Sequence, residues 1–380
     1  MKRTFKYRIY ANNQTITKAE NWLRLCCNLY NCALEERIDS WKKLRIPLSL
    51  YNQINELPNL RKIFSDYKGV DSQSLRTPLR ILDNSFKAFF RRMRSGEKPG
   101  FPRFKSISRF NSITLERAGW HLDGRYLWIH KIGRFKMNLS RPIEGKIKTI
   151  TIKRTPTNKW YVCFSCDEVP EKILPQSDKV VGLDMGVKSY LTDSEGNHIE
   201  NPKWLRHTQR MLRVKQRKLA RAIKGSNRRK ESRLQVAKLH EKITNQRLDW
   251  QHKLANNYIK NYGIIVIEDL AISNMVRNHC LARSISDCAW GNFFQLLKYK
   301  AEEAGREIVE SYRFKPTSKT CSSCGAINKT LKLSDREWVC QVCGTLHDRD
   351  ENAAKNIKES GFEQNLQTLT QASASAIRSL

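Results

Sequence analysis

Four cysteines near the C-terminus have the spacing of a metal site. Cys321 and Cys324 form one Cys-x-x-Cys pair, Cys340 and Cys343 form a second, and fifteen residues separate the pairs. In a zinc ribbon each pair lies in a tight turn that directs two thiolates at one tetrahedral ion, and here a glycine follows each pair. The spacing predicts one structural Zn²⁺ held by these four side chains rather than two unrelated pairs.

Three carboxylates could form a second, catalytic metal site. Asp184 interrupts the apolar run 180–187, Glu268 ends the apolar run 263–267, and Asp350 lies where an alanine-rich helix is expected to begin. A charge within an apolar strand is costly unless it is paired or binds a cation. Two strands and a terminal helix that each donate one acid are the layout of the RNase H fold. Two Mg²⁺ ions about 4 Å apart, held by such oxygen ligands, stabilise in-line phosphodiester hydrolysis. Asp348 competes with Asp350 for the third position.

The elements that position these residues can be predicted from the spacing of apolar residues. In the C-terminal half, strands are expected over 180–188, 263–268 and 308–313, with a helix over 290–304. The turn 193–196 should return the chain as an antiparallel neighbour. In the N-terminal half, helices are expected over 15–41 and 75–93. Short strands over 126–129, 147–153 and 160–166, joined by the alternating segment 5–10, predict a small β-barrel.

Other cysteines are expected to bind no metal. Cys26, Cys27 and Cys32 lie in or beside the apolar stripe of the first helix, so burial as small hydrophobic residues is the better interpretation. Cys163 and Cys166 also have Cys-x-x-Cys spacing. Residues three apart on a strand point to opposite faces, however, so these two should not share an ion.

Two basic clusters are candidate phosphate contacts. Segment 203–247 holds sixteen Lys and Arg with few acidic residues, and its apolar stripes, interrupted at 225–227, predict a basic helical hairpin. A solvated helix end and a surface hairpin without a ligand are the alternatives. The candidate nucleic-acid contacts are Arg91, Arg92, Arg94 and Lys98 at the second helix end, and Arg228, Arg229 and Lys230 in the hairpin.

Composition narrows the class of partner. The 380 residues carry 70 Lys and Arg against 37 Asp and Glu, a formal net charge of +33, which predicts a nucleic-acid partner. No apolar run is long enough to span a membrane, and no signal-peptide pattern begins the chain. The odd number of cysteines, eleven, indicates free thiols and therefore a reducing, cytoplasmic setting.

Six segments spread along the chain form a set that is more specific than any one of them. They are Lys6-Tyr7-Arg8-Ile9-Tyr10, residues 98–105, Gly182-Leu183-Asp184-Met185-Gly186, Ile267-Glu268-Asp269-Leu270, residues 317–325, and Asp348-Arg349-Asp350-Glu351-Asn352-Ala353-Ala354. Together these segments resemble the TnpB family of RuvC-like nucleases, which insertion sequences encode and which are related to type V CRISPR effectors. The resemblance covers nearly the whole chain.

The resemblance implies a monomeric, prokaryotic RNA-guided DNA endonuclease. A guide RNA from the element's end would select double-stranded target DNA beside a short adjacent motif. Its catalytic acids would be Asp184, Glu268 and Asp350, with two Mg²⁺ ions and one structural Zn²⁺; Asp350 is preferred because relatives retain the acid two residues before Asn352. The implied multidomain α+β and α/β chain has a wedge β-barrel (1–10 and 99–172), a helical recognition lobe (11–98), an RNase H-like RuvC domain (173–315 and 345–362, with the hairpin at 203–247), an inserted zinc ribbon (316–344), and a disordered tail (363–380).

Other functions remain open at this point. A nuclease-silent, RNA-guided DNA-binding regulator would use the same basic surfaces, but it would not need three intact acids. An accessory transposase of the insertion sequence and a guide-independent junction resolvase would also suit an RNase H fold. Cleavage with and without the cognate RNA distinguishes these functions.

Overall fold

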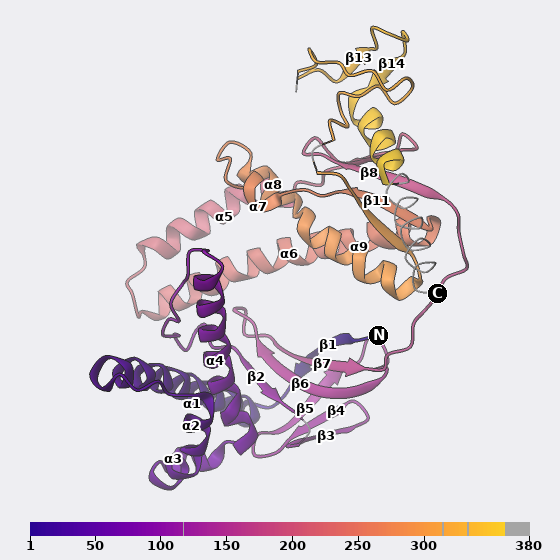
Figure 1. Cartoon of the computed structure of the whole chain (residues 1–380). Helices are drawn as coiled ribbons and strands as arrows, with labels where there is room; N and C mark the ends of the chain where they lie inside the picture. The colour runs from indigo at the N-terminus through magenta and orange to yellow at the C-terminus, as the bar shows by residue number, and fades with distance from the viewer. Residues whose placement is uncertain (117, 314, 333, 362–380) are drawn as a thin grey trace, which may run out of the picture. The chain divides into compact units, whose positions relative to one another are not determined.

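The computed structural model describes residues 1–116, 118–313, 315–332 and 334–361. The chain divides into two compact units, Met1–Pro170 and a second that begins at Glu171 (Figure 1). Within the described ranges no helix is long and apolar enough to cross a membrane. The predicted disordered tail, 363–380, lies outside the described residues.

The first unit contains one seven-stranded antiparallel sheet. Its central strand is β1, which pairs with β7 on one side and β5 on the other, as the alternating N-terminal segment predicted. The strand order is β2-β6-β7-β1-β5-β4-β3. The strands are β1 (Arg3–Tyr10), β2 (Ser112–Leu115), β3 (Trp120–Asp123), β4 (Tyr126–Ile129), β5 (Gly133–Asn138), β6 (Lys146–Arg154) and β7 (Trp160–Asp167).

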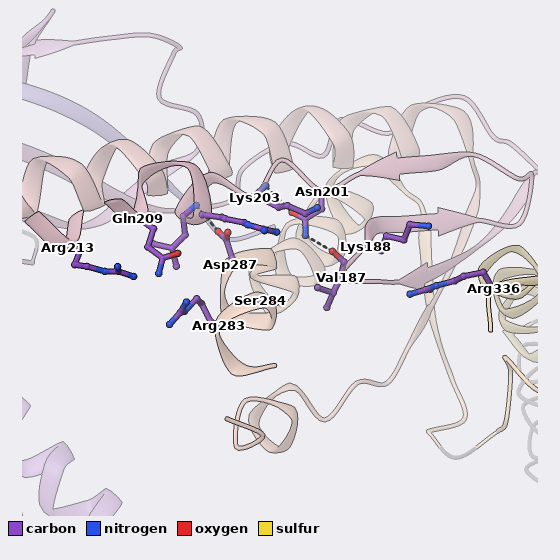
Figure 2. Close-up of a pocket in the computed structure, with 12 residues that line it drawn as sticks. Val187, Lys188, Asn201, Lys203, Gln209, Arg213, Arg283, Ser284, Asp287 and Arg336 are labelled. Carbon is purple, nitrogen blue, oxygen red and sulfur yellow. Dashed lines mark hydrogen bonds between the residues drawn. The ribbon is translucent and has the colours of Figure 1, made fainter. Parts of the chain in front are cut away.

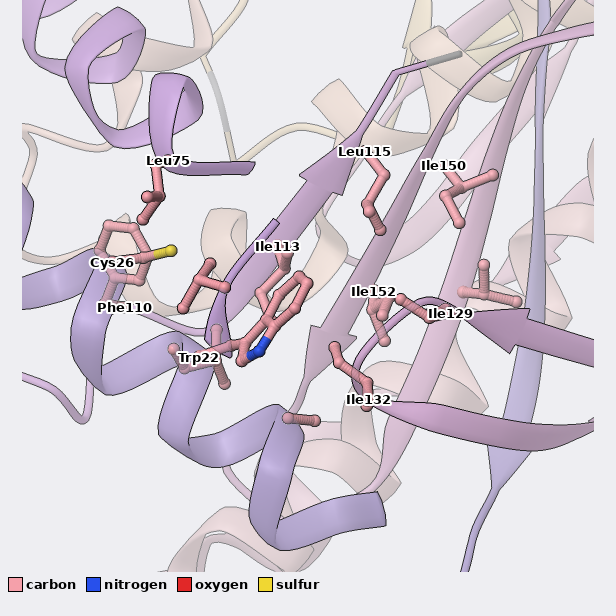
Figure 3. Packing of buried hydrophobic residues seen from close by; sticks show 14 of the residues in the cluster. Trp22, Cys26, Leu75, Phe110, Ile113, Leu115, Ile129, Ile132, Ile150 and Ile152 are labelled. Carbon is pink, nitrogen blue, oxygen red and sulfur yellow. The ribbon is translucent and has the colours of Figure 1, made fainter. Parts of the chain in front are cut away.

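The helices of this unit share a hydrophobic core with the inner face of the sheet. Trp22 and Cys26 of α1 and Leu75 of α4 pack in one cluster with the strand residues Ile113 and Ile152 (Figure 3). Asn12 and Asp71 cap the two long helices by accepting backbone N–H bonds. The helices are α1 (Asn13–Asp39), η1 (Ser40–Leu44), α2 (Leu50–Asn55), α3 (Leu57–Ile63), η2 (Ser65–Gly69) and α4 (Ser72–Arg94).

One expectation for this unit needs correction, and another is not confirmed. Cys26 and Cys27 are buried as predicted, but Cys32 is exposed; six residues after Cys26, at about 100° per residue, it has rotated off the buried stripe. The predicted barrel is not shown, because among the described residues the edge strands β2 and β3 are not paired with each other. Cys163 and Cys166 lie on opposite faces of β7, as expected.

The second unit is built on a mixed five-stranded sheet of order β10-β9-β8-β11-β12. Strands β8, β11 and β12 are parallel, and β8, β9 and β10 form an antiparallel meander. The last strand begins one residue earlier and ends two residues earlier than predicted. The strands are β8 (Val180–Met185), β9 (Ser189–Asp193), β10 (His198–Glu200), β11 (Ile264–Glu268) and β12 (Glu307–Ser311).

The predicted hairpin is present as α5 and α6, but α6 continues well beyond residue 247. After that point one face of the helix becomes apolar, and Ala255, Tyr258 and Ile259 are buried in the same core as α9 and the sheet. The helices of this part are α5 (Trp204–Arg221), α6 (Asn227–Asn261), α7 (Ile272–Met275), α8 (Ala282–Cys288) and α9 (Trp290–Ala304).

A terminal helix over residues 349–361 follows a small hairpin of β13 (Glu337–Val339) and β14 (Leu346–Asp348). It lies directly on the sheet: a Cβ at Gly182 would be 2.3 Å from the Ala354 carbonyl oxygen, and one at Gly361 would be 2.4 Å from the Val266 side chain. Ala353 and Ala354 are fully buried, as the alanine pattern predicted. Glycine in β8 therefore lets the helix approach the strand that carries Asp184.

Candidate active site

The first two acids lie at the same edge of the parallel sheet. The register pairs Leu183 of β8 with Ile267 of β11, so Asp184 and Glu268 each follow a paired residue on neighbouring parallel strands. Carboxyl ends of parallel strands are where ligands bind in open α/β sheets. The local sequence predicted that each acid lies in a strand. The register between β8 and β11 is what brings Asp184 and Glu268 to the same edge.

The two candidates for the third acid have different contacts. Asp348 accepts hydrogen bonds of 2.9 Å from the backbone N–H groups of Asp350 and Glu351, which is the geometry of a helix N-cap. The carboxylate of Asp350 instead forms ion pairs with Arg349 (2.8 Å) and Arg336 (3.2 Å). Asp348 therefore begins the helix, and Asp350 lines the pocket that Asp184 also lines.

The electrostatics of this site favour a bound cation. Burial raises the pKa of Asp184 well above its usual value, and the negative charges of Glu268 and Asp350 raise it further. Burial also raises the pKa of Glu268, and a hydrogen bond from the Thr317 side chain lowers it by a smaller amount. Buried carboxylates that repel one another become stable as anions when a metal ion neutralises them.

The acid pocket has a volume of about 470 Å³ and a basic rim. Asp184 and Asp350 line it together with Lys188, Lys332 and Arg336. Glu268 is not among the lining residues. Among the described residues the four ribbon cysteines form a compact metal-ligand group, and the three carboxylates do not.

A second, larger pocket continues from the acid pocket. Its volume is about 780 Å³, and it shares Val187, Lys188 and Arg336 with its neighbour. Figure 2 shows Lys188 and Arg336 at one end and Arg213 at the other. Its one lining carboxylate, Asp287, is already bound by Arg247 at 2.8 Å. The basic lining residues are Lys188, Lys203, Arg206, Arg213, Arg283 and Arg336.

The predicted basic contacts have unequal environments. Arg91, Arg92, Arg94 and Lys98 are all exposed at or just after the end of α4. In the hairpin, Arg228 and Lys230 are exposed. The guanidinium of Arg229 instead donates to the carbonyl oxygens of Leu219 and Ala222 at the end of α5, so it closes the hairpin.

The outer face of the seven-stranded sheet is a basic and aromatic surface that the sequence analysis did not identify. His121, Trp128 and Arg134 are successive cross-strand partners on β3, β4 and β5. The rings of His121 and Trp128 are stacked at 5.9 Å, and the Arg134 guanidinium lies 5.5 Å from the Trp128 ring centre. On β1 and β7, the Lys6 ammonium lies 4.4 Å from the Tyr161 ring centre. Cations beside aromatic faces suit phosphates and unpaired bases.

The four ribbon cysteines fit a tetrahedral metal site. Their sulfur atoms all lie within 4.8 Å of one another, and the Cys321–Cys343 and Cys324–Cys340 distances are both 3.6 Å. A tetrahedral site with Zn–S bonds of about 2.3 Å places its sulfurs roughly 3.8 Å apart. His347, which is buried, also lies 3.0 Å from the Cys321 sulfur. The cluster can therefore hold a zinc ion.

Comparison with known proteins identifies the family. A family model described as "Probable transposase" matches residues 163–279, and one described as "Cas12f1-like, TNB domain" matches residues 290–357. A "Putative RNA-guided DNA endonuclease" of Streptomyces pristinaespiralis is 34% identical over 368 residues, which covers 95% of this chain and 90% of that protein. The chain belongs to the TnpB family.

A second sequence relative and a solved structure are consistent with membership of the TnpB family. The "Putative RNA-guided DNA endonuclease InsQ" of Escherichia coli is 31% identical over 314 residues, covering 77% of this chain and 75% of that one. A cryo-EM structure of a Cas12f1–sgRNA–target DNA complex shares the fold with a TM-score of 0.59 at 16% identity, covering 92% of this chain and 83% of that one. The chain therefore shares its fold with a Cas12f1 effector.

Three polar residues of the candidate site were not assigned a role from the sequence, although Thr317 and Arg349 lie within motifs of the family resemblance. Arg336 and Arg349 contact Asp350, and the Thr317 hydroxyl donates to Glu268 at 3.3 Å. Basic residues are frequent in this chain, and a threonine before a cysteine knuckle has many structural uses. For the sheet surface, by contrast, the alternation of basic and aromatic residues in β1 was an available signal.

Proposed function

We propose that this chain is an RNA-guided DNA endonuclease that hydrolyses target DNA at Asp184, Glu268 and Asp350. The observation that carries the proposal is the meeting of these acids beside a basic pocket: two lie at the carboxyl ends of neighbouring parallel strands, and the third lies in the first turn of the helix packed on those strands. Relatives named as RNA-guided DNA endonucleases match the chain over most of their length.

In this mechanism the acids hold the metal and the basic residues hold the substrate. Two Mg²⁺ ions, when bound, would supply electrostatic stabilisation of the attacking and leaving oxygens. Asp184 and Glu268 would provide oxygen ligands from the sheet, and Asp350 would provide one from the helix. Arg336 and Lys332 at the pocket rim would orient the phosphodiester, and the adjoining basic pocket would hold neighbouring phosphates of the same strand.

The zinc ribbon has a structural role in the proposal. Zn²⁺ bound by Cys321, Cys324, Cys340 and Cys343 would fix the hairpin β13–β14, whose last residue, Asp348, caps the helix that carries Asp350. The exposed cations of α4, the hairpin and the outer sheet face would contact the guide RNA and the DNA duplex. We expect the protein to act as a monomer.

Cleavage by the RNA-loaded protein tests this proposal. The wild-type complex should cut a plasmid that matches the guide only when Mg²⁺ is present. Asp184→Asn should bind the same plasmid but leave it uncut. Equal cutting by Asp184→Asn would remove this acid from the active site, and binding without cutting by the wild type would favour the nuclease-silent regulator.

A further inference from the structure

We propose that Thr317 is a positioning residue that fixes the Glu268 carboxylate relative to Asp350. Two asparagines on the helix 349–361 hold Thr317 in place. This inference rests on the proposed function, because it assigns Glu268 and Asp350 to one metal site. It concerns side chains that join the ribbon, strand β11 and the terminal helix, all within the second unit.

The contact with Glu268 comes from a buried hydroxyl. Thr317 is 5% exposed, and its Oγ1 donates to Oε1 of Glu268 at 3.3 Å. The distance is longer than the usual 2.7–2.8 Å of such a bond, as contacts in active sites often are before substrate binds. Strand β11 fixes the backbone of Glu268, but its side chain has three rotatable bonds. A hydroxyl on one carboxylate oxygen selects among its rotamers and leaves the other oxygen for a metal.

The backbone of Thr317 is held from the helix side. Nδ2 of Asn356 donates to the carbonyl oxygens of Thr317 and Thr320 at 2.7 and 2.6 Å, and Nδ2 of Asn352 donates to that of Thr320 at 2.7 Å. Oδ1 of Asn352 accepts from the Ser322 N–H at 2.9 Å. Both asparagines are buried, and four residues apart on a helix they share one face. The first cysteine knuckle is thereby attached to the helix.

These contacts form one hydrogen-bonded path between two of the acids. Asp350 lies two residues before Asn352 on the same rigid helix, so the asparagines place Thr317 at a set position relative to Asp350. Thr317 in turn orients Glu268. The alternative is that the asparagines stabilise only the ribbon and that the Thr317 hydroxyl has no effect on metal binding.

Paired substitutions at residue 317 separate these two possibilities. Thr317→Val keeps the branched shape but removes the hydroxyl, and Thr317→Ser keeps the hydroxyl. Thr330→Val is the matched control, since Thr330 is an exposed ribbon residue whose hydroxyl donates to nearby Asn328. For each RNA-loaded variant, cleavage is measured against Mg²⁺ concentration, and Mn²⁺ binding is measured by electron paramagnetic resonance together with zinc content.

We expect Thr317→Val to weaken Mn²⁺ binding and raise the half-maximal Mg²⁺ concentration by about tenfold, the size of a lost hydrogen bond to a charged group. Thr317→Ser should stay within about twofold of wild type, as should Thr330→Val, with one zinc per chain in each. Asn356→Ala keeps the Thr317 hydroxyl but removes the hydrogen bond that holds the Thr317 backbone, so it should also weaken metal binding.

The inference is overturned if Thr317→Val binds Mn²⁺ like the wild type, or if Thr317→Val and Thr317→Ser are impaired equally. It is also overturned if Thr317→Val loses zinc and melts earlier while Asn356→Ala binds Mn²⁺ normally, since the role would then be structural. Failure of the proposed function has a different signature: the wild type would bind Mn²⁺ at this site without cutting guided DNA.

Discussion

The adjacent acids Asp348 and Asp350 should respond to substitution in opposite ways. Asp348 accepts from two backbone N–H groups at the start of the helix, each at 2.9 Å, whereas Asp350 lines the acid pocket. Asparagine caps helices about as well as aspartate does, and alanine caps them poorly, at a cost of about 1 kcal/mol. The useful perturbations are therefore Asp348→Asn, Asp348→Ala and Asp350→Asn.

The magnitudes follow from these contacts. Asp348→Asn keeps both hydrogen bonds and should cut within a few-fold of wild type. Asp348→Ala loses about 1 kcal/mol at the helix start, which lowers the population of the intact first turn by roughly fivefold at most, with a comparable loss of rate. Asp350→Asn loses a metal ligand and should cut at least about 10³-fold more slowly, a difference of about 4 kcal/mol.

Single-turnover cleavage by the RNA-loaded complexes, at saturating Mg²⁺, measures these rates. Thermal unfolding of the same samples should show a drop of a few degrees for Asp348→Ala only. The reasoning is refuted if Asp348→Asn is as inactive as Asp350→Asn, because a capping role tolerates asparagine and a metal ligand does not.

Three further predictions concern zinc, pH and salt. Elemental analysis should find about one zinc per chain. Cys340→Ser should lose the zinc and unfold the segment that leads into the helix carrying Asp350. Zinc-free protein with full activity would contradict this prediction. Because the pKa of Asp184 is raised in the fold, the folded protein holds this proton more tightly than the unfolded chain, so without Mg²⁺ the free energy of unfolding should fall as pH rises above the ordinary aspartate range. Asp184→Asn should reduce that fall, leaving the part that the raised pKa of Glu268 contributes, and should also reduce the rise in Tm on adding Mg²⁺; an unchanged pH profile would show that the charge of Asp184 is already compensated. Arg228→Ala and Lys230→Ala should each reduce the slope of log affinity for RNA against log salt concentration by up to about one unit. Arg229→Ala should chiefly lower the Tm, because its guanidinium binds carbonyl oxygens at the end of α5. Slopes equal to that of the wild type in all three variants would exclude phosphate contact at the hairpin.

The sequence predicted the elements of the site better than their assembly. The apolar runs around Asp184 and Glu268 identified two buried strands, and the alanine pattern after Asp350 identified the inner face of the terminal helix. The pairing of β8 with β11 depends on long-range register, which local periodicity does not contain. The close approach of the helix at Gly182 likewise appears only when both elements are in place.

Side-chain roles were harder to predict than element types. Asp348 and Asp350 are chemically equivalent in the sequence, and only the backbone geometry of the helix start separates a cap from a pocket residue. Arg229 was expected to contact phosphate, but its guanidinium binds carbonyl oxygens of α5. The barrel expectation relied on strand count, and strand count does not determine whether the edges of a sheet meet.

The most direct test of the central claim is to exchange the guide. The protein is purified with its bound RNA, the guide segment is replaced, and double-strand cutting is measured on plasmids that match either the old or the new segment beside the adjacent motif. We predict that cutting moves entirely to the new match, requires Mg²⁺ and is absent in Asp184→Asn. Cutting that ignores the guide, or that persists after the RNA is removed, would contradict RNA guidance and leave a nuclease of another kind.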